Sequence, residues 1–159
     1  MHHKVTTKAI IVLTTLTLGG CFGFGGGKPL DGPSSLIKRA GDQIVGGAFA
    51  VAPRTFTPFK FAVPSGSSKL ELDGTFSASG GANNDIEVTL LEESQFLNWQ
   101  NGHKFTATYQ SGRVTADRIR IPLPPDPVTY VMVFSNRFSI FSAKDVKAEV
   151  KLQYDRSTR

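Results

Sequence analysis

Apolar and polar side chains alternate along most of the chain after about residue 43. The clearest alternation runs from Val146 to Tyr154, where Val, Ala, Val, Leu and Tyr occupy every second position and Lys, Glu, Lys and Gln lie between them. Successive side chains of a strand point to opposite faces, so this pattern is typical of antiparallel strands with one buried and one solvated face. Comparable alternation is found in residues 59–63, 69–76, 85–90, 104–109 and 118–123.

Two segments depart from this alternation. Residues 130–134 read Tyr-Val-Met-Val-Phe, and an unbroken apolar run of this length predicts a central strand buried on both faces. Residues 92–100 are the only candidate for a helix, in which Phe96 and Trp99 share a face at spacing i, i+3. That segment is short and has no capping residue.

Turn-forming residues separate the predicted strands, in clusters at residues 64–67, 80–84, 101–102, 111–112 and 124–127. Asn101-Gly102 suits a type I′ hairpin turn, in which both central residues have positive φ. Asp73-Gly74 suits either a second hairpin turn or a glycine bulge within one longer strand. About eight strands at a spacing of roughly 10–14 residues predict an all-β fold, either an antiparallel β-sandwich or a small barrel. We favour a jelly-roll-like sandwich.

The first 20 residues have the parts of a secretory signal peptide. Lys4 and Lys8 supply positive charge, and Ala9–Leu18 is an apolar run too short to cross about 30 Å of hydrocarbon. The next residues, Leu18-Gly19-Gly20-Cys21, resemble the lipobox of bacterial lipoproteins. This resemblance implies cleavage before Cys21, a diacylglyceryl group on its thiol and acylation of the new amino terminus. The alternative is an ordinary secretory signal followed by a free thiol.

Membrane attachment by two or more acyl chains is stable, whereas a single chain gives only marginal binding. Phe22 follows the cysteine. In bacteria with two membranes an aspartate there commonly retains lipoproteins in the inner membrane, so the resemblance favours the outer membrane. Residues 21–40 are rich in Gly, Pro and Ser and predict a flexible linker, followed by one domain over residues 41–159. Leu36–Arg39 either starts the domain or lies on the membrane.

The charge pattern does not predict nucleic-acid binding. The formal net charge is +5, and it falls to +3 when Lys4 and Lys8 leave with the signal. Basic and acidic residues are interleaved without a basic run, whereas nucleic acids require clustered cations. The single cysteine excludes a disulfide framework.

The C-terminal half resembles two families of small β-sandwich domains. Residues 130–136 lead into Phe138–Phe141, Lys144 and the strand that ends at Tyr154. This sequence is similar to the last strands of emp24/GOLD domains and of bacterial pre-peptidase C-terminal domains. The resemblance implies a sandwich that binds partners or accompanies enzymes and is not itself catalytic. Residues 84–88 read Asn-Asp-Ile-Glu-Val and depart from the Asp-Leu-Tyr usual in pre-peptidase domains, so the resemblance bears on the fold and does not extend to their cation site.

Catalytic chemistry has few candidates in the mature sequence. His103 is its one histidine, and it follows a predicted turn, where a histidine is usually solvated. No Gly-x-Ser-x-Gly motif is present, and the glycine-rich residues 23–27 lack the following Lys-Ser/Thr of a phosphate-binding loop. One histidine cannot build a zinc site. We therefore expect no enzyme activity, no cofactor and no such metal centre, with an unrecognised hydrolase site near His103 as the minor alternative.

Oxygen donors and aromatic rings give two candidate sites. Asn83, Asn84, Asp85 and Glu87 offer the oxygen ligands that calcium accepts, although Asn and Asp also favour turns. Phe96, Trp99 and Tyr109 flank one predicted turn. Exposed rings in this arrangement stack on sugars or anchor a partner, and core packing is the alternative interpretation.

Opposite charges form a third group. Glu92-Glu93 and Arg118 with Arg120 either pair, face a partner or lie on solvated strand faces. Taken together, the sequence predicts an envelope lipoprotein that acts as a non-catalytic binding or structural module. Its expected partners are the lipid bilayer, through acylated Cys21, and an envelope protein or glycan. The alternative is a carbohydrate- or cell-wall-binding module that uses exposed aromatic side chains.

Overall fold

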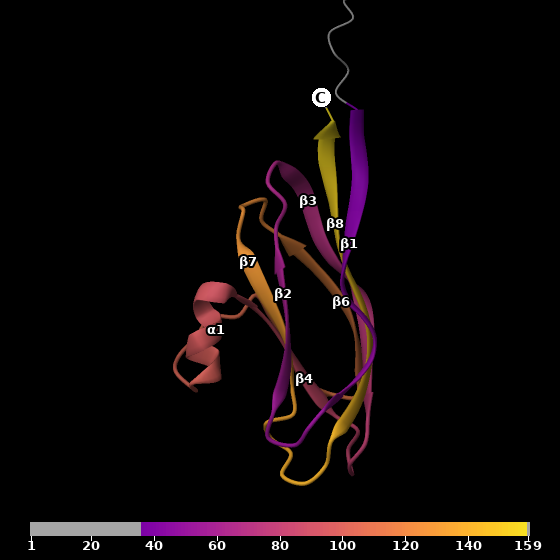
Figure 1. Cartoon of the computed structure of the whole chain (residues 1–159), viewed down its shortest axis with the longest axis vertical. Coiled ribbons are helices and arrows are strands. Elements are labelled where there is room, and N and C mark those ends of the chain that lie inside the picture. Colours follow the sequence, from indigo (N-terminus) through magenta and orange to yellow (C-terminus); the bar gives the residue numbers. More distant parts are fainter. Residues whose placement is uncertain (1–35, 159) are drawn as a thin grey trace, which may run out of the picture. The chain divides into compact units, whose positions relative to one another are not determined.

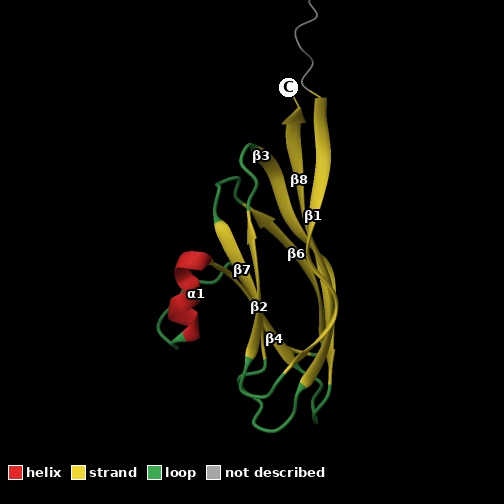
Figure 2. Ribbon diagram, viewed as in Figure 1, coloured by secondary structure: helices red, strands yellow, loops and turns green. Residues whose placement is uncertain are grey.

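The computed structural model describes residues 36–158, so Cys21 and the signal peptide lie outside the described residues. Eight strands and one helix follow one another in this part of the chain (Figures 1 and 2). The elements are β1 (Leu36–Val51), β2 (Phe56–Ala62), β3 (Ser67–Ser79), β4 (Ile86–Glu92), α1 (Glu93–Gln100), β5 (Tyr109–Val114), β6 (Ala116–Leu123), β7 (Thr129–Ser135) and β8 (Lys144–Thr158).

The strands form two four-stranded antiparallel sheets, with the orders β1-β8-β3-β6 and β2-β7-β4-β5. The strands pair as they would in one long hairpin that is rolled into two layers. The pairs are β1·β8, β2·β7, β3·β6 and β4·β5. The contacts β3·β8 and β4·β7 then join these pairs within each sheet. This is the strand order of a jelly roll. The predicted all-β sandwich of eight strands is therefore confirmed.

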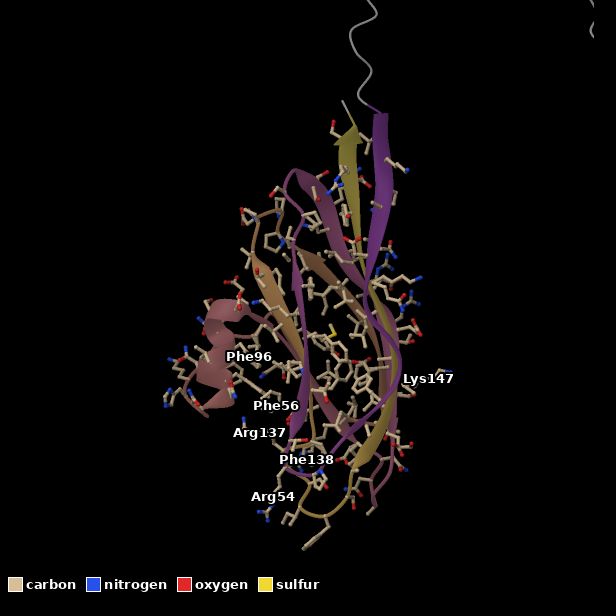
Figure 3. The ribbon with its side chains drawn as sticks, in the orientation of Figure 1. Arg54, Phe56, Phe96, Arg137, Phe138 and Lys147 are labelled. Carbon is tan, nitrogen blue, oxygen red and sulfur yellow. The ribbon has the colours of Figure 1, made fainter. Side chains whose placement is uncertain are left out.

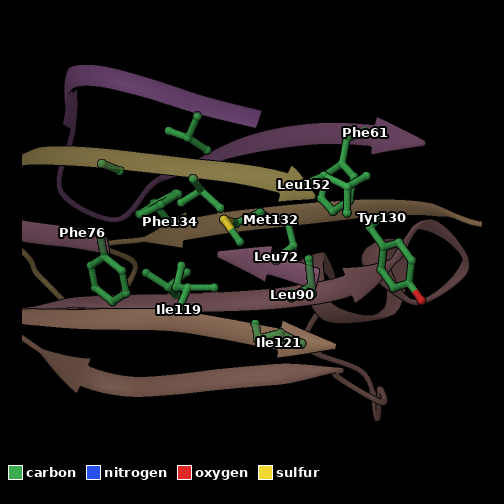
Figure 4. Close-up of a cluster of buried hydrophobic side chains, with 14 of the residues drawn as sticks. Phe61, Leu72, Phe76, Leu90, Ile119, Ile121, Tyr130, Met132, Phe134 and Leu152 are labelled. Atoms are coloured by element: carbon green, nitrogen blue, oxygen red, sulfur yellow. The ribbon is translucent and has the colours of Figure 1, made fainter. Parts of the chain in front are cut away.

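Aromatic side chains at the centre of the sandwich tie the two sheets together. The ring of Phe134 on β7 meets the rings of Phe49, Phe59 and Phe76 edge-on, at centroid distances of 5.2, 5.8 and 5.8 Å. Edge-to-face contacts of this kind contribute about 0.5–1.5 kcal/mol each beyond their buried area. Aliphatic side chains from both sheets surround these rings (Figure 4), among them Leu72, Leu90, Ile119, Met132 and Leu152.

The alternation of β8 is realised as the sequence predicts. All five apolar residues at every second position from Val146 to Tyr154 are buried, and the three charged residues between them are exposed. β7 is buried on both faces, which confirms its predicted central position. Its second face carries Val131 and Val133, which pack with Leu91 and Trp99 in a separate apolar cluster beneath α1. The helix therefore acts as a cover over part of the outer face of this sheet.

The predicted hairpin at Asn101-Gly102 is wrong. Asn101 has a φ of −87°, and its backbone N–H donates to the carbonyl of Leu97, so it caps the C-terminus of α1. Gly102 has a φ of 72°, the left-handed conformation common just after a helix. The helix predicted over residues 92–100 is present as α1. Because this helix, and not a strand, precedes Asn101-Gly102, these residues do not form a hairpin turn.

The predicted strand over residues 104–109 is also wrong, because only Tyr109 belongs to a strand. Phe105 and Ala107 do point to one side, but they pack on the cluster beneath α1. The backbone N–H of Thr106 donates to the side chain of Gln95 in α1. Side-chain packing on the helix, not pairing with another strand, produces the alternation here.

Strand boundaries elsewhere differ from the sequence pattern in three places. The turn predicted at residues 111–112 is wrong, because Ser111 and Gly112 lie inside β5, at a register shift in its pairing with β4. Asp73-Gly74 lies inside β3 and pairs in regular register with β6 and β8, so it forms neither a hairpin turn nor a bulge. β1 begins at Leu36, within residues 21–40 that the sequence assigns to the linker, and pairs with the end of β8. Leu36–Arg39 thus starts the sandwich.

Candidate functional site

Phe96 and Trp99 lie together on the inner side of α1, as the i, i+3 spacing requires. Their rings stack at 5.9 Å with an interplanar angle of 15°, and Phe56 of β2 meets the Trp99 ring edge-on at 5.0 Å. The guanidinium of Arg137 lies 5.3 Å from the Trp99 ring and donates to the Trp99 carbonyl. Trp99 is only 8% exposed, so most of its ring holds the helix on the sheet.

Tyr109 does not join these two residues. Its ring packs against the main core between the sheets, and its hydroxyl donates a 2.7 Å hydrogen bond to the Asp117 carboxylate. Burial raises the pKa of Tyr109, and the hydrogen bond to Asp117 raises that pKa further. The three aromatic residues named from the sequence therefore do not form one ligand surface.

An open depression of about 510 Å³ lies beside Trp99 on the outer face of the β2-β7-β4-β5 sheet. We call it the sheet depression; its lining residues are Glu87, Thr89, Trp99, Phe105, Gln110 and Gly112. Gly112 has a φ of 65°, and a side chain there would meet no atom within 4 Å. The depression combines ring surface with a carboxylate, an amide and a hydroxyl. Among these residues the sequence singles out only Trp99 and Glu87 as candidates, and it predicts a strand at Phe105.

The loop Asn83–Asp85 is organised by contacts within the protein. The Asp85 carboxylate accepts a 2.9 Å hydrogen bond from the ammonium of Lys144, and the Asn84 side chain accepts one from the Gly80 backbone N–H. Glu87, the fourth oxygen donor, pairs with Arg113 at 3.2 Å. Within residues 36–158 no three His, Cys, Asp or Glu side chains gather as ligands for a metal ion. Lys144 provides the positive charge that a bound cation would bring to Asp85.

Three of the four charged residues named from the sequence, Glu93, Arg118 and Arg120, form ion pairs with residues of other elements. Arg118 lies 3.5 Å from Asp73 and Arg120 lies 3.3 Å from Glu71, so both arginines bridge β6 to β3. Glu93 pairs with Lys60 of β2. All three pairs are largely exposed, and each contributes about 0–1 kcal/mol.

Three connections meet at the end of the sandwich opposite Leu36, the lower end in Figure 1. We call this region the loop end: residues 52–55 between β1 and β2, 80–85 between β3 and β4, and 136–143 between β7 and β8. Phe138 lies in this region (Figure 3). The Arg113 guanidinium lies 4.2 Å and the Lys144 ammonium 5.9 Å from its ring centroid. A shallow depression of about 350 Å³ lies between the second and third connections.

His103 lies exposed just after α1, where its backbone N–H donates to the carbonyl of Asn98. Its backbone therefore extends the helix cap, and its side chain is exposed. In the part of the chain from residue 36 to residue 158, no helix has both the length and the apolar character needed to cross a bilayer. Comparison of the sequence with protein-family models and with curated proteins finds no match.

Proposed function

We propose that the protein is a membrane-anchored envelope lipoprotein whose β-sandwich serves as a non-catalytic binding module. The observation that carries this proposal is Leu18-Gly19-Gly20-Cys21, because the only cysteine of the chain stands where a lipobox requires it. A Gly/Pro/Ser-rich segment follows, and a single sandwich begins at Leu36. In a two-membrane cell Phe22 directs the protein to the outer membrane.

A cysteine substitution tests the anchor. Cys21→Ser removes the thiol that takes the diacylglyceryl group, so the protein should move from the membrane fraction of the source cells to the aqueous phase of a detergent partition. Phe22→Ala is the matched control, since it leaves the lipobox intact and should stay in the membrane. Continued membrane association of Cys21→Ser, resistant to high salt, would contradict acyl anchoring.

The sheet depression supports a second candidate function, the binding of a neutral saccharide. Sugars present C–H faces that stack on aromatic rings and hydroxyl groups that both donate and accept hydrogen bonds. Trp99 and Phe105 offer ring surface beside the Glu87 carboxylate, the Gln110 amide and the Thr89 hydroxyl. Residue 112 is glycine, so nothing fills the open side of the depression. Aromatic walls with a few polar groups are typical of small-molecule sites.

Phe105→Ala tests this candidate more cleanly than Trp99→Ala, because Trp99 is a buried member of the cluster beneath α1, whereas Phe105 is only partly buried against that cluster. The Cys21→Ser protein would be titrated with peptidoglycan fragments and neutral oligosaccharides by calorimetry. Phe105→Ala and Gln110→Ala should each weaken binding about tenfold. Phe141→Ala, which removes an exposed ring outside the depression, should bind like the parent. Absence of binding to every glycan, or equal binding by Phe105→Ala, would rule out the saccharide site.

A further inference from the structure

Two consecutive apolar side chains are exposed at the loop end. Ile140 is 54% exposed and Phe141 is 90% exposed. The other large exposed apolar residues of the described chain, Ile37 and Leu97, lie singly at the start of β1 and on α1. Water exposure of an adjacent Ile and Phe is unfavourable, and clustered apolar exposure commonly marks an interaction surface.

The connection that carries Ile140 and Phe141 is held in one conformation by its neighbours. Asn136 is fully buried, and its side-chain amide donates to the backbone carbonyls of Val51, Ala52 and Ser142. The backbone N–H of Arg54, a residue with a φ of 61°, donates to the carbonyls of Asn136 and Ser139.

A left-handed conformation is unfavourable for a residue with a side chain, so these contacts stabilise a strained position. The Ser139 side chain also bonds both to the carbonyl and to the N–H of Ser142. The exposed pair therefore rests on a preorganised support.

The charges of the loop end are mainly positive. Arg54 and Arg137 are exposed cations of its connections, and Asp85, the one carboxylate in these connections, is paired with Lys144. Arg137 lies on the flank toward α1, against Trp99 (Figure 3). Asp145, the second residue of β8, is exposed, but Lys147 lies on the same face of that strand two residues further on.

We propose that the loop end docks on an anionic lipid bilayer, with Ile140 and Phe141 entering the boundary between headgroups and acyl chains. Apolar side chains that enter this boundary, next to cations that meet anionic headgroups, are the physical basis of reversible surface binding. A stable protein interface buries about 800 Å² on each partner, whereas here only two adjacent apolar side chains are exposed. This contact does not depend on acylation of Cys21, and it lies at the opposite end of the sandwich from Leu36.

Vesicle binding by the full chain carrying Cys21→Ser tests the proposal without any contribution from the acyl anchor. The protein would be floated with vesicles of phosphatidylcholine alone and with vesicles containing phosphatidylglycerol. We expect partition onto the phosphatidylglycerol vesicles, a loss of about tenfold for Phe141→Ser, and weaker binding as salt is raised. Arg54→Gln should weaken binding to anionic vesicles and leave binding to neutral ones unchanged.

Leu97→Ser is the matched control, because it removes an exposed leucine of similar size from α1 and should bind like the parent. Equal urea midpoints of all variants would show that the exposed substitutions leave the fold intact. Absence of binding to anionic vesicles, or unchanged binding by Phe141→Ser, would overturn the proposal and leave a protein partner as the occupant of the loop end. Failure of acylation in cells would contradict the proposed anchor and leave this result unaffected.

Discussion

The ammonium of Lys144, the first residue of β8, lies 2.9 Å from the Asp85 carboxylate, which precedes β4 in the other sheet. Only 3% of the Lys144 side chain and 13% of the Asp85 side chain are exposed. The same ammonium donates to the carbonyl of Gly80. Burial acts to raise the pKa of Asp85, but the hydrogen bond and charge of Lys144 outweigh it and leave that pKa below its usual value. This pair links the two sheets at the loop end.

Lys144→Met should destabilise the protein by about 2–3 kcal/mol. Methionine keeps the apolar stem, but it leaves the Asp85 carboxylate without its partner in a site with little water, where breaking an ion pair is costly. Part of the carboxylate still reaches solvent, so the loss should stay below that of a fully buried pair. Urea unfolding at neutral pH measures the difference.

Arg120→Met is the control for this substitution. It removes one partner of another ion pair, the pair between Arg120 and Glu71. The Arg120 side chain is 69% exposed. The expected cost is at most about 1 kcal/mol. Equal losses for the two variants would show that the Lys144–Asp85 pair contributes no more than an ordinary surface pair.

Acid should destabilise the fold through carboxylates that are charged in the folded state. Hydrogen bonds from Lys69, and then from Arg39, lower the pKa of Asp155 against the opposing effect of burial. Because the folded pKa lies below 3.8, the usual value for an aspartate side chain, this stabilisation is present above about pH 4 and is lost as the pH falls through the folded pKa. Asp85 contributes with the same sign.

Asp155→Asn separates this effect from general acid unfolding. The variant should be less stable than the parent at pH 7. The difference in urea midpoint should shrink as the pH falls through the folded pKa of Asp155, below which this carboxyl is protonated in both the folded and the unfolded protein. A difference that stays constant over this range would mean that Asp155 stabilises the fold by packing and not by its charge.

Gly74 is a position where the sheet itself requires glycine. A Cβ built on this residue in β3 lies 2.2 Å from the backbone carbonyl oxygen of Glu149 and 2.7 Å from the Cα of Val150, both in β8. Gly74→Ala should therefore cost about 1–3 kcal/mol, because the backbone of β8 must shift. Gly41→Ala is the matched control, since its Cβ meets the Leu152 carbonyl at an ordinary 3.6 Å and should change stability by less than about 0.5 kcal/mol. Equal urea midpoints would contradict the close approach of β3 and β8.

Local side-chain patterns predicted the strands well where one face meets the core and the other meets solvent. β8 is the clearest case, because its alternation corresponds to one buried and one exposed face. The unbroken apolar run of β7 likewise corresponds to burial on both faces. The pattern failed at residues 104–109, where Phe105 and Ala107 alternate because they pack on the cluster beneath α1. Alternation indicates which side chains are buried. It does not indicate whether they pack between the two sheets or against a helix.

The candidate sites depend on contacts between residues distant in the sequence. Asp85 and Lys144 are separated by 59 positions, so the oxygen-rich loop around Asp85 gave no sign of the lysine that binds it. The sheet depression likewise brings Glu87 of β4 together with Gln110 of β5, 23 positions later. Exposure of Phe141 followed from no sequence pattern, because its support comes from Asn136 and Arg54.

The central claim is that Cys21 is the acylated first residue of the mature protein. Intact-mass spectrometry of the protein extracted from its native membranes, followed by sequencing of its first peptide, tests this claim most directly. The account predicts a chain that starts at Cys21 and carries the added mass of a diacylglyceryl group and an N-linked acyl chain, all lost in Cys21→Ser. A mature chain that starts at another residue, or that starts at Cys21 with a free thiol, would contradict it.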